Sequence, residues 1–342
     1  MSYSWGDDSG DSTIKSKSKS GYDYGSARKA YGSSSSKEGS SSERSSLKSK
    51  SERTRSSTAS ARRSAYKSRR GRTPPPVGKN LKTTSTHPIV VAVDVTGSMA
   101  RWPAILFEKL ALLGDEVKRY APKYKISFTA FGDVYCDSYP LQVRDFASGK
   151  KLDEHVLALY PEGEGGDAPE SHDMVAYFYL NHCNIDKAIK PIFIFITDVC
   201  SHRSLEASAI KRYTGDKAQS SLDSVELLKK LGEKFSVYVL LKCLEDAAFW
   251  RKIYGAQKVK PIEEPRDVVE LIIGLVAAEL GELKDFEMRS SRRHADKPDR
   301  VKRVMKSVKS GTEKTDAKSD GKAKKTAKKK TSKKSMKSKK LV

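Results

Sequence analysis

Oxygen-bearing side chains stand at alternate positions in one short segment of the chain. The segment Asp94-x-Thr96-x-Ser98 carries one carboxylate and two hydroxyls, and it follows the apolar run 89–93 directly. A hard cation such as Mg²⁺ prefers about six oxygen ligands in octahedral geometry, and alternate side chains of one turn can point toward a common centre. Neutral hydroxyl ligands leave the charge of the ion uncancelled, so the ion can accept a carboxylate from a partner. The segment therefore predicts a binding site for Mg²⁺, or for Mn²⁺ or Ca²⁺.

Two distant segments end in carboxylates that can complete such a site. Asp198 follows the apolar run 192–196, and Asp167 ends the glycine-rich loop 162–167. In open α/β sheets, ligands bind at the carboxyl ends of the strands, where neighbouring loops diverge. We expect the loops to bring these residues to the same edge as Asp94.

Four further residues are candidates for the rim of this site, and each has a simpler reading. His172 and His202 are either outer hydrogen-bonding partners of the site or ordinary surface or capping histidines. Asp133 either orients a ligand or forms a turn. Glu170 either raises the local cation concentration or belongs to a solvated acidic loop.

The pattern of apolar runs predicts the elements that position these residues. Short apolar runs alternate with longer amphipathic ones, as in β-α units with a mostly parallel sheet. Strands are expected at 89–93, 126–131, 141–144, 192–196, 235–241 and 257–261, and helices at 103–120, 151–159, 168–181, 220–231, 245–253 and 265–280. Pro103, Pro169 and Pro265 suit first helical turns. The predicted fold is an open, doubly wound α/β sandwich.

Together, the three motifs resemble a von Willebrand factor type A domain with a metal-ion-dependent adhesion site. The resemblance covers about residues 87–282 and rests on the Asp94 segment, the Gly165-Gly166-Asp167 loop and Asp198 after a strand. It implies that Thr96 and Ser98 bind the ion directly, and that Asp94 and Asp198 bind it directly or through water. Many members have threonine where this chain has Asp167, and a direct third carboxylate would weaken the attraction for a partner carboxylate.

Charge divides the chain into three parts. The formal net charge of +23 separates into +12 for residues 1–86, −6 for 87–288 and +17 for 289–342. The two ends lack apolar periodicity, so we expect disordered tails around one acidic domain. Flexible basic chains bind nucleic acid or another polyanion non-specifically. The same composition is also typical of a tail that only increases solubility, or of a nuclear import signal. The candidate polyanion-binding residues are Arg62, Arg63, Lys67, Arg69, Arg70, Arg72, Lys324, Lys325, Lys328, Lys329, Lys330, Lys333 and Lys334.

Cysteine spacing and hydropathy bear on the compartment. The four cysteines lie far apart without a C-x-x-C pair, which predicts neither a zinc ribbon nor a disulfide framework. No signal peptide or membrane span is indicated, because charged residues and glycine interrupt the longest apolar stretch, 268–280. We expect an intracellular protein of the nucleus or cytoplasm, or of a virus particle.

These observations favour a non-catalytic binding module. In this hypothesis the central domain captures a protein ligand that presents Asp or Glu through Mg²⁺, while the tails tether the protein to nucleic acid or another polyanion. An alternative is a nucleic-acid packaging or scaffold protein, in which the domain is a structural or oligomerisation unit. A third hypothesis is a metal-dependent hydrolase in which the same ion activates water.

Overall fold

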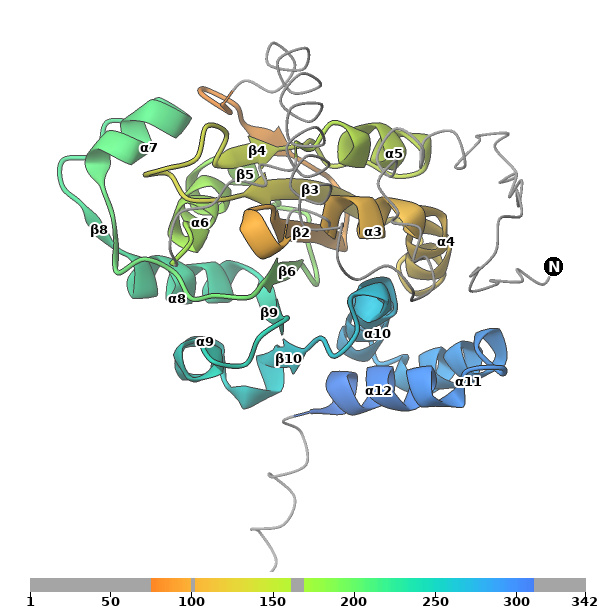
Figure 1. Ribbon diagram of the computed structural model, residues 1–342. Coiled ribbons are helices and arrows are strands. Elements are labelled where there is room, and N and C mark those ends of the chain that lie inside the picture. The colour runs from red at the N-terminus through yellow and green to blue at the C-terminus, as the bar shows by residue number, and fades with distance from the viewer. Residues whose placement is uncertain (1–74, 100–101, 161–168, 311–342) are drawn as a thin grey trace, which may run out of the picture.

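A six-stranded sheet runs through the part of the chain that the computed structural model describes, residues 75–99, 102–160 and 169–310 (Figure 1). The strand order is β10-β9-β6-β2-β3-β4, and among these strands β4 alone is antiparallel to its neighbour. The bounds are β2 Pro88–Asp94, β3 Lys125–Phe131, β4 Leu141–Val143, β6 Ile192–Thr197, β9 Ser236–Leu241 and β10 Val259–Pro261. Each expected strand overlaps one of these, which confirms the mostly parallel α/β class.

Strand β2 is buried at every position because helices cover both faces of the sheet. Ile89, Val91 and Val93 pack into the apolar cluster on one face, whereas Val90 and Ala92 pack into the cluster on the other. Alternate side chains of a strand point to opposite faces, so a strand between two helical layers is apolar throughout. This explains why β2 reads as a continuous apolar run in the sequence.

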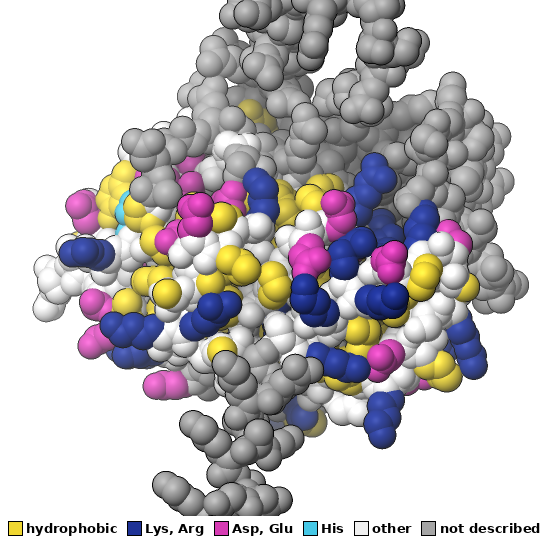
Figure 2. Space-filling view, turned by 60° about the horizontal axis from the view of Figure 1, so that its bottom comes forward, with side chains coloured by type: hydrophobic (Ala, Val, Ile, Leu, Met, Phe, Trp, Pro, Cys, Tyr) yellow, Lys and Arg dark blue, Asp and Glu magenta, His cyan; other side chains and the backbone are white. Residues whose placement is uncertain are grey.

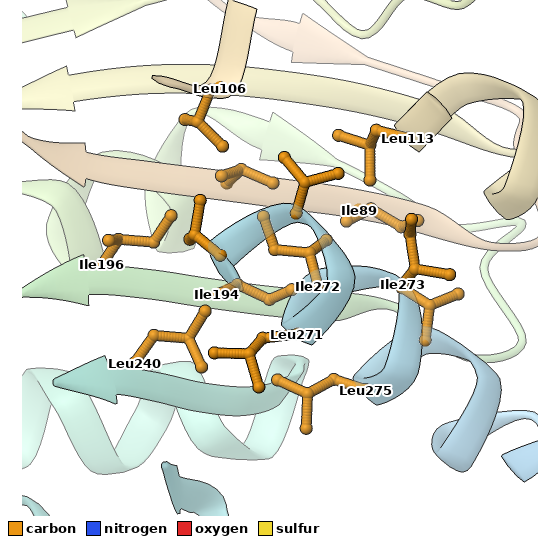
Figure 3. Close-up of a cluster of buried hydrophobic side chains, with 14 of the residues drawn as sticks. Ile89, Leu106, Leu113, Ile194, Ile196, Leu240, Leu271, Ile272, Ile273 and Leu275 are labelled. Carbon is orange, nitrogen blue, oxygen red and sulfur yellow. The ribbon is translucent and has the colours of Figure 1, made fainter. Parts of the chain in front are cut away.

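The helices form one layer on each face of the sheet. The first layer contains α3 Trp102–Glu108, α4 Leu110–Tyr120, α5 Lys150–Leu157, α10 Val268–Glu279, α11 Leu283–Arg293 and α12 Pro298–Lys309. The second contains α6 His172–Asn181, α7 Ala207–Thr214, α8 Ser224–Lys234 and α9 Ala247–Tyr254. Figure 3 shows α10 packing Leu271, Ile272 and Leu275 against the side chains of Ile194 and Leu240 in the sheet.

Short elements complete the described part of the chain. Two small two-stranded sheets pair β1 with β5 and β7 with β8. Their bounds, with those of the 3₁₀ turns, are β1 Leu81–Lys82, β5 Cys183–Asn184, β7 Ser204–Leu205, β8 Leu222–Asp223, η1 Gly97–Met99, η2 Ala256–Lys258 and η3 Pro265–Asp267.

The helices differ from the sequence-based expectation in three main respects. The run 103–120 is interrupted between α3 and α4, at Lys109. Helix α6 begins at His172 rather than at Pro169, because Glu170 forms an isolated bridge with Ser201 and is held in an extended segment. Helix α7 was not expected at all.

The folded domain continues beyond its expected end at residue 288. Helices α11 and α12 occupy most of 283–309, where a disordered tail was predicted from 289 onward. The reason is an apolar stripe at helical spacing in α12: Val301, Val304, Met305 and Val308 are all buried against the first layer. Between residues 75 and 310 the formal charge is +3, so the folded part is not the acidic unit expected for 87–288.

A buried lysine joins the end of α12 to the sheet. Lys260 of β10 is 2% exposed, and its Nζ donates hydrogen bonds to the backbone oxygens of Val308 at 2.8 Å and Ser310 at 2.6 Å. The Ser307 hydroxyl donates to the Pro261 carbonyl oxygen at 2.6 Å. The positive charge lies at the helix end whose free carbonyls carry partial negative charge. Burial lowers the pKa of Lys260 to about 8.

Two buried carboxylates attach the same helices to α10 and η3. Glu270 is fully buried and accepts hydrogen bonds from Arg293 at 2.9 Å and His294 at 2.8 Å. Although burial raises the pKa of Glu270, these two partners lower it to about 2. Asp267 pairs with Arg300 at 2.9 Å and with Arg303 at 3.1 Å. The C-terminal helices are therefore held by charge as well as by apolar contact.

Charges of both signs alternate on the face that carries α9 and α12. Figure 2 shows Lys and Arg side chains interspersed with Asp and Glu on this face. Lys306 lies 2.8 Å from Glu263, and Lys309 lies 3.0 Å from Glu287. No helix among the described residues is long and apolar enough to cross a membrane.

Candidate metal site

The candidate site lies at the carboxyl edge of the sheet, where the strand order reverses. β2 and β6 are neighbours whose chains continue to opposite sides of the sheet, so the loops that follow them diverge. β2 ends at Asp94 and leads through Thr96 into η1, while β6 ends at Thr197 and is followed by Asp198. Parallel pairing therefore brings the first and last predicted ligand motifs to one edge.

Asp94 is fully buried and accepts three hydrogen bonds. The backbone N–H and the hydroxyl of Thr96 donate to Oδ1 at 2.9 and 2.7 Å, and the Thr197 hydroxyl donates to Oδ2 at 3.2 Å. Burial and, to a smaller extent, the charge of Asp198 raise the pKa of Asp94, whereas the hydrogen bonds from Thr96 and Thr197 lower it; together these effects raise the pKa to about 7. The fixed carboxylate thus lies among hydroxyls, in a setting that favours a compensating positive charge.

Glu170 lies at the same edge and points inward. Its side chain is 5% exposed, and burial, followed by the charge of Asp94, raises its pKa to about 9. A hydrogen bond with Thr96 acts in the opposite direction. Glu170 is therefore not part of a solvated acidic loop, and it lies within the electrostatic field of Asp94.

Asp198 is paired with a lysine that the sequence interpretation did not include. Its Oδ2 lies 3.4 Å from the Nζ of Lys242, the residue that follows β9. The backbone N–H of Lys242 donates to the Thr197 carbonyl oxygen at 3.0 Å, which fixes the lysine beside the end of β6. In the sequence, Lys242 could have been identified from its position directly after the apolar run 235–241, because residues that follow parallel strands lie at the same edge as Asp94 and Asp198.

Asp133 and His202 form a separate pair beside the site. Nε2 of His202 lies 2.9 Å from Oδ1 of Asp133, and the exposed ring of Tyr135 packs edge-on against the imidazole. Although burial raises the pKa of Asp133, hydrogen bonds from His202, the Tyr135 N–H and Cys136 lower it overall. The structure therefore gives Asp133 a histidine partner.

His172 is a core residue and does not form the rim. It is fully buried, with ring centroids 4.7 Å from Phe131, 4.8 Å from Trp250 and 5.4 Å from Phe195. Its Nδ1 lies 3.3 Å from the Glu170 carbonyl oxygen. Burial lowers its pKa to about 3, so the imidazole is neutral at physiological pH. These three aromatic side chains explain why His172 is buried. The polar residues next to His172 along the chain gave no indication of this burial.

Several predicted residues cannot be placed. The side chain of Ser98, all of Asp167 and every candidate polyanion-binding residue fall outside the described part of the chain. Among the described residues, no three His, Cys, Asp or Glu side chains are grouped so as to hold a metal ion. Asp94 and Glu170 are two hard oxygen donors with the Thr96 hydroxyl beside them, and a buried oxygen of Glu170 has no hydrogen-bond partner in this part of the structure. These donors suit a hard divalent cation.

Comparisons with known proteins do not assign this chain to a family. No family model and no curated protein matches the sequence. Similar solved structures include the pilus adhesin SpaC from Lactobacillus rhamnosus GG in its open conformation, at 14% identity and a TM-score of 0.41, over 61% of this chain and 31% of the adhesin. Proximal thread matrix protein 1 from the mussel byssus matches at 11% identity and a TM-score of 0.42, over 60% of this chain and 49% of that protein. The chain thus matches less than half the length of either protein.

Proposed function

We propose that the folded domain is a non-catalytic, cation-dependent binding module of the von Willebrand factor type A kind. In this proposal a divalent ion, Mg²⁺ or alternatively Mn²⁺ or Ca²⁺, is held by Asp94, Thr96, Ser98, Asp167 and Asp198. The ion then accepts an Asp or Glu side chain from a partner protein.

The supporting observation is the convergence of Asp94, Thr96 and Asp198 at one edge of the sheet. Asp94 is held by the Thr96 and Thr197 hydroxyls, and its pKa responds to the charge of Asp198. The ligands of a hard cation are carboxylate and hydroxyl oxygens, and hydroxyls hold the ion without cancelling its charge. A cation with an unfilled position at this edge would attract a carboxylate from outside.

In this proposal Lys242 competes with the ion for Asp198. Its ammonium lies 3.4 Å from Asp198, where it neutralises a proposed ligand. Binding of a divalent ion would exchange this contact for one with the metal. The side chain of Lys242 is 35% exposed, so it has solvent in which to move.

The tails enter the proposal from the sequence alone. Residues 311–342 carry a formal charge of +10 and residues 1–74 carry another +10. Lysine and arginine on such segments would hold the protein near nucleic acid or another polyanion, with an affinity that falls steeply with salt. Deletion of 311–342 should reduce this salt-sensitive binding and leave metal binding unchanged.

The first test is calorimetric titration of Mg²⁺ and Mn²⁺ into the full-length protein. Asp94→Asn keeps the shape of the side chain but removes its charge, and we expect it to abolish specific binding. Asp299→Asn, on the exposed first turn of α12, is the matched control and should bind like the wild type. Equal metal affinity in wild type and Asp94→Asn would refute the proposal.

A second test addresses the open coordination position. With Mn²⁺ bound, the relaxation rate of water protons reports exchange of metal-bound water. Acetate should lower this enhancement by displacing water from the ion, whereas acetamide, its uncharged analogue, should have a much smaller effect. If acetate leaves the relaxation rate unchanged, the bound ion is closed to carboxylates, and the capture mechanism fails although the metal site stands.

A further inference from the structure

One carboxylate oxygen of Glu170 lacks a hydrogen-bond partner among the described residues. The atom is Oε2, and the residue that carries it is 5% exposed. A buried oxygen of this kind is costly unless a proton, a donor or a cation compensates it. Its neighbours on the described elements therefore indicate what it binds.

The backbone of Glu170 is fixed to the loop that follows β6. Its N–H donates to the Cys200 carbonyl oxygen at 3.1 Å, and its own carbonyl oxygen accepts from the His202 N–H at 3.3 Å. It also forms an isolated bridge with Ser201. These contacts hold Glu170 in register with the end of β6, a few residues after Asp198. This isolated bridge and its two hydrogen bonds thus fix the backbone from which the buried side chain extends.

Glu170 and Asp94 share one hydroxyl group. The Thr96 hydroxyl donates to Asp94 at 2.7 Å and also lies within reach of Glu170. A threonine hydroxyl carries a single proton, so it can satisfy only one of the two carboxylates at a time. No lysine or arginine among the described residues pairs with Asp94 or Glu170. Two buried carboxylates thus lie beside one neutral donor, an arrangement that a divalent cation would stabilise.

We propose that Glu170 is a further ligand of the cation at this edge, together with Asp94 and the Thr96 hydroxyl. The inference rests on the proposed function, because it takes the same ion as its ligand. With both carboxylates on a divalent ion, their two negative charges balance the charge of the ion. The ion is then retained more strongly but attracts an incoming carboxylate less strongly than an ion held by one carboxylate.

The test is a titration of Mn²⁺ into the metal-free, full-length protein with two matched variants. Glu170→Gln retains the shape and loses the charge, and we expect its Mn²⁺ affinity to fall at least about tenfold. The same change removes the cost of burying an ionisable carboxyl group beside Asp94, so the melting temperature without metal should rise by about 2–4 °C. Glu270→Gln is the control: Glu270 is equally buried but faces Arg293 and His294, so its loss should lower the melting temperature and leave Mn²⁺ affinity unchanged.

The possible outcomes separate the two proposals. If wild type binds Mn²⁺ and Glu170→Gln binds it equally well, Glu170 is not a ligand, while the proposed function stands. If wild type does not bind Mn²⁺, both proposals fail. Glu170→Asp keeps the carboxylate but shortens the side chain by one methylene group, and it provides a second variant should the first fold poorly. It should bind Mn²⁺ more weakly than wild type without a rise in melting temperature, and unchanged binding by this variant would also overturn the inference.

Discussion

The C-terminal helices should be necessary for the stability of the domain. The perturbation is to end the chain at residue 288, the expected boundary, instead of at residue 310, where α12 has finished. This removes all of α12 and the last five residues of α11, 289–293. In both fragments the chain begins at residue 75, so the sheet and the remaining helices are the same.

The size of the effect follows from the burial of α12. Its apolar stripe places Val301, Val304, Met305 and Val308 at 9%, 1%, 6% and 4% exposure. Full burial of such a side chain contributes about 1.5–3 kcal/mol, so the four contribute about 6–12 kcal/mol as an upper estimate. The total stability of a domain is about 5–15 kcal/mol. Truncation also removes Arg293 and His294, the two partners of Glu270, and loss of its partners is strongly destabilising for a buried carboxylate.

Urea unfolding followed by circular dichroism and tryptophan fluorescence measures this difference. The fragment 75–310 should unfold cooperatively, whereas 75–288 should be unfolded, or nearly so, in the absence of urea. If the two fragments have the same unfolding midpoint, α12 does not stabilise the core, and the reasoning from its buried stripe is wrong.

Three further predictions concern the site and the packing beneath it. The pKa values of Asp94 (about 7) and Glu170 (about 9) lie above their ordinary values of 3.8 and 4.5, so the native state binds more protons than the unfolded chain between these limits. Stability without metal should therefore fall as the pH rises from about 4 to 9, as urea midpoints in chelator would show; a midpoint that rises over this range contradicts the charge assignment. Lys242→Ala should remove the ion pair with Asp198 and so increase Mg²⁺ affinity several-fold in calorimetry. The exposed control Lys302→Ala should leave the affinity unchanged, and equal affinities for wild type and Lys242→Ala would show that the lysine does not compete with the ion. Gly274→Ala should cost about 1–3 kcal/mol in urea unfolding, because an added Cβ would lie 2.8 Å from Phe286 and 2.9 Å from Val308; a neutral effect would mean that α10, α11 and α12 separate easily.

The central sheet was predictable from the sequence because its strands are buried on both faces. Strands such as β2 and β6 are therefore continuous apolar runs in the sequence. The mostly parallel class followed from the β-α alternation, and parallel strands place Asp94 and Asp198 at the same edge of the sheet.

The C-terminal helices were not predictable from charge and composition. Arginine and lysine dominate α12, and they hide an apolar stripe of four residues at helical spacing. Positive charges such as Arg300 and Arg303 are compensated by Asp267, a contact between segments distant in sequence. A test for periodicity in addition to a count of charges would have identified this helix.

The details of the site depend on contacts across the fold, which a single sequence does not reveal. His172 is buried because Phe131, Phe195 and Trp250 come from three different elements and meet around it. Glu170 points inward because its backbone pairs with the loop after β6. Neither fact has a local signature, so both residues were assigned to the rim.

The attachment of α12 to β10 also has a consequence for association between copies of the chain. β10 is the last strand of the sheet, and an unprotected last strand can pair with a strand of another molecule and begin aggregation. The Ser307 hydroxyl donates a hydrogen bond to the Pro261 carbonyl oxygen of β10. At the opposite margin of the sheet, the Lys79 ammonium donates a hydrogen bond to the Val143 carbonyl oxygen of β4 at 3.1 Å. With both margins engaged by side chains of the same molecule, extension of the sheet by strand addition is disfavoured. Strand addition at either margin would first have to break these hydrogen bonds.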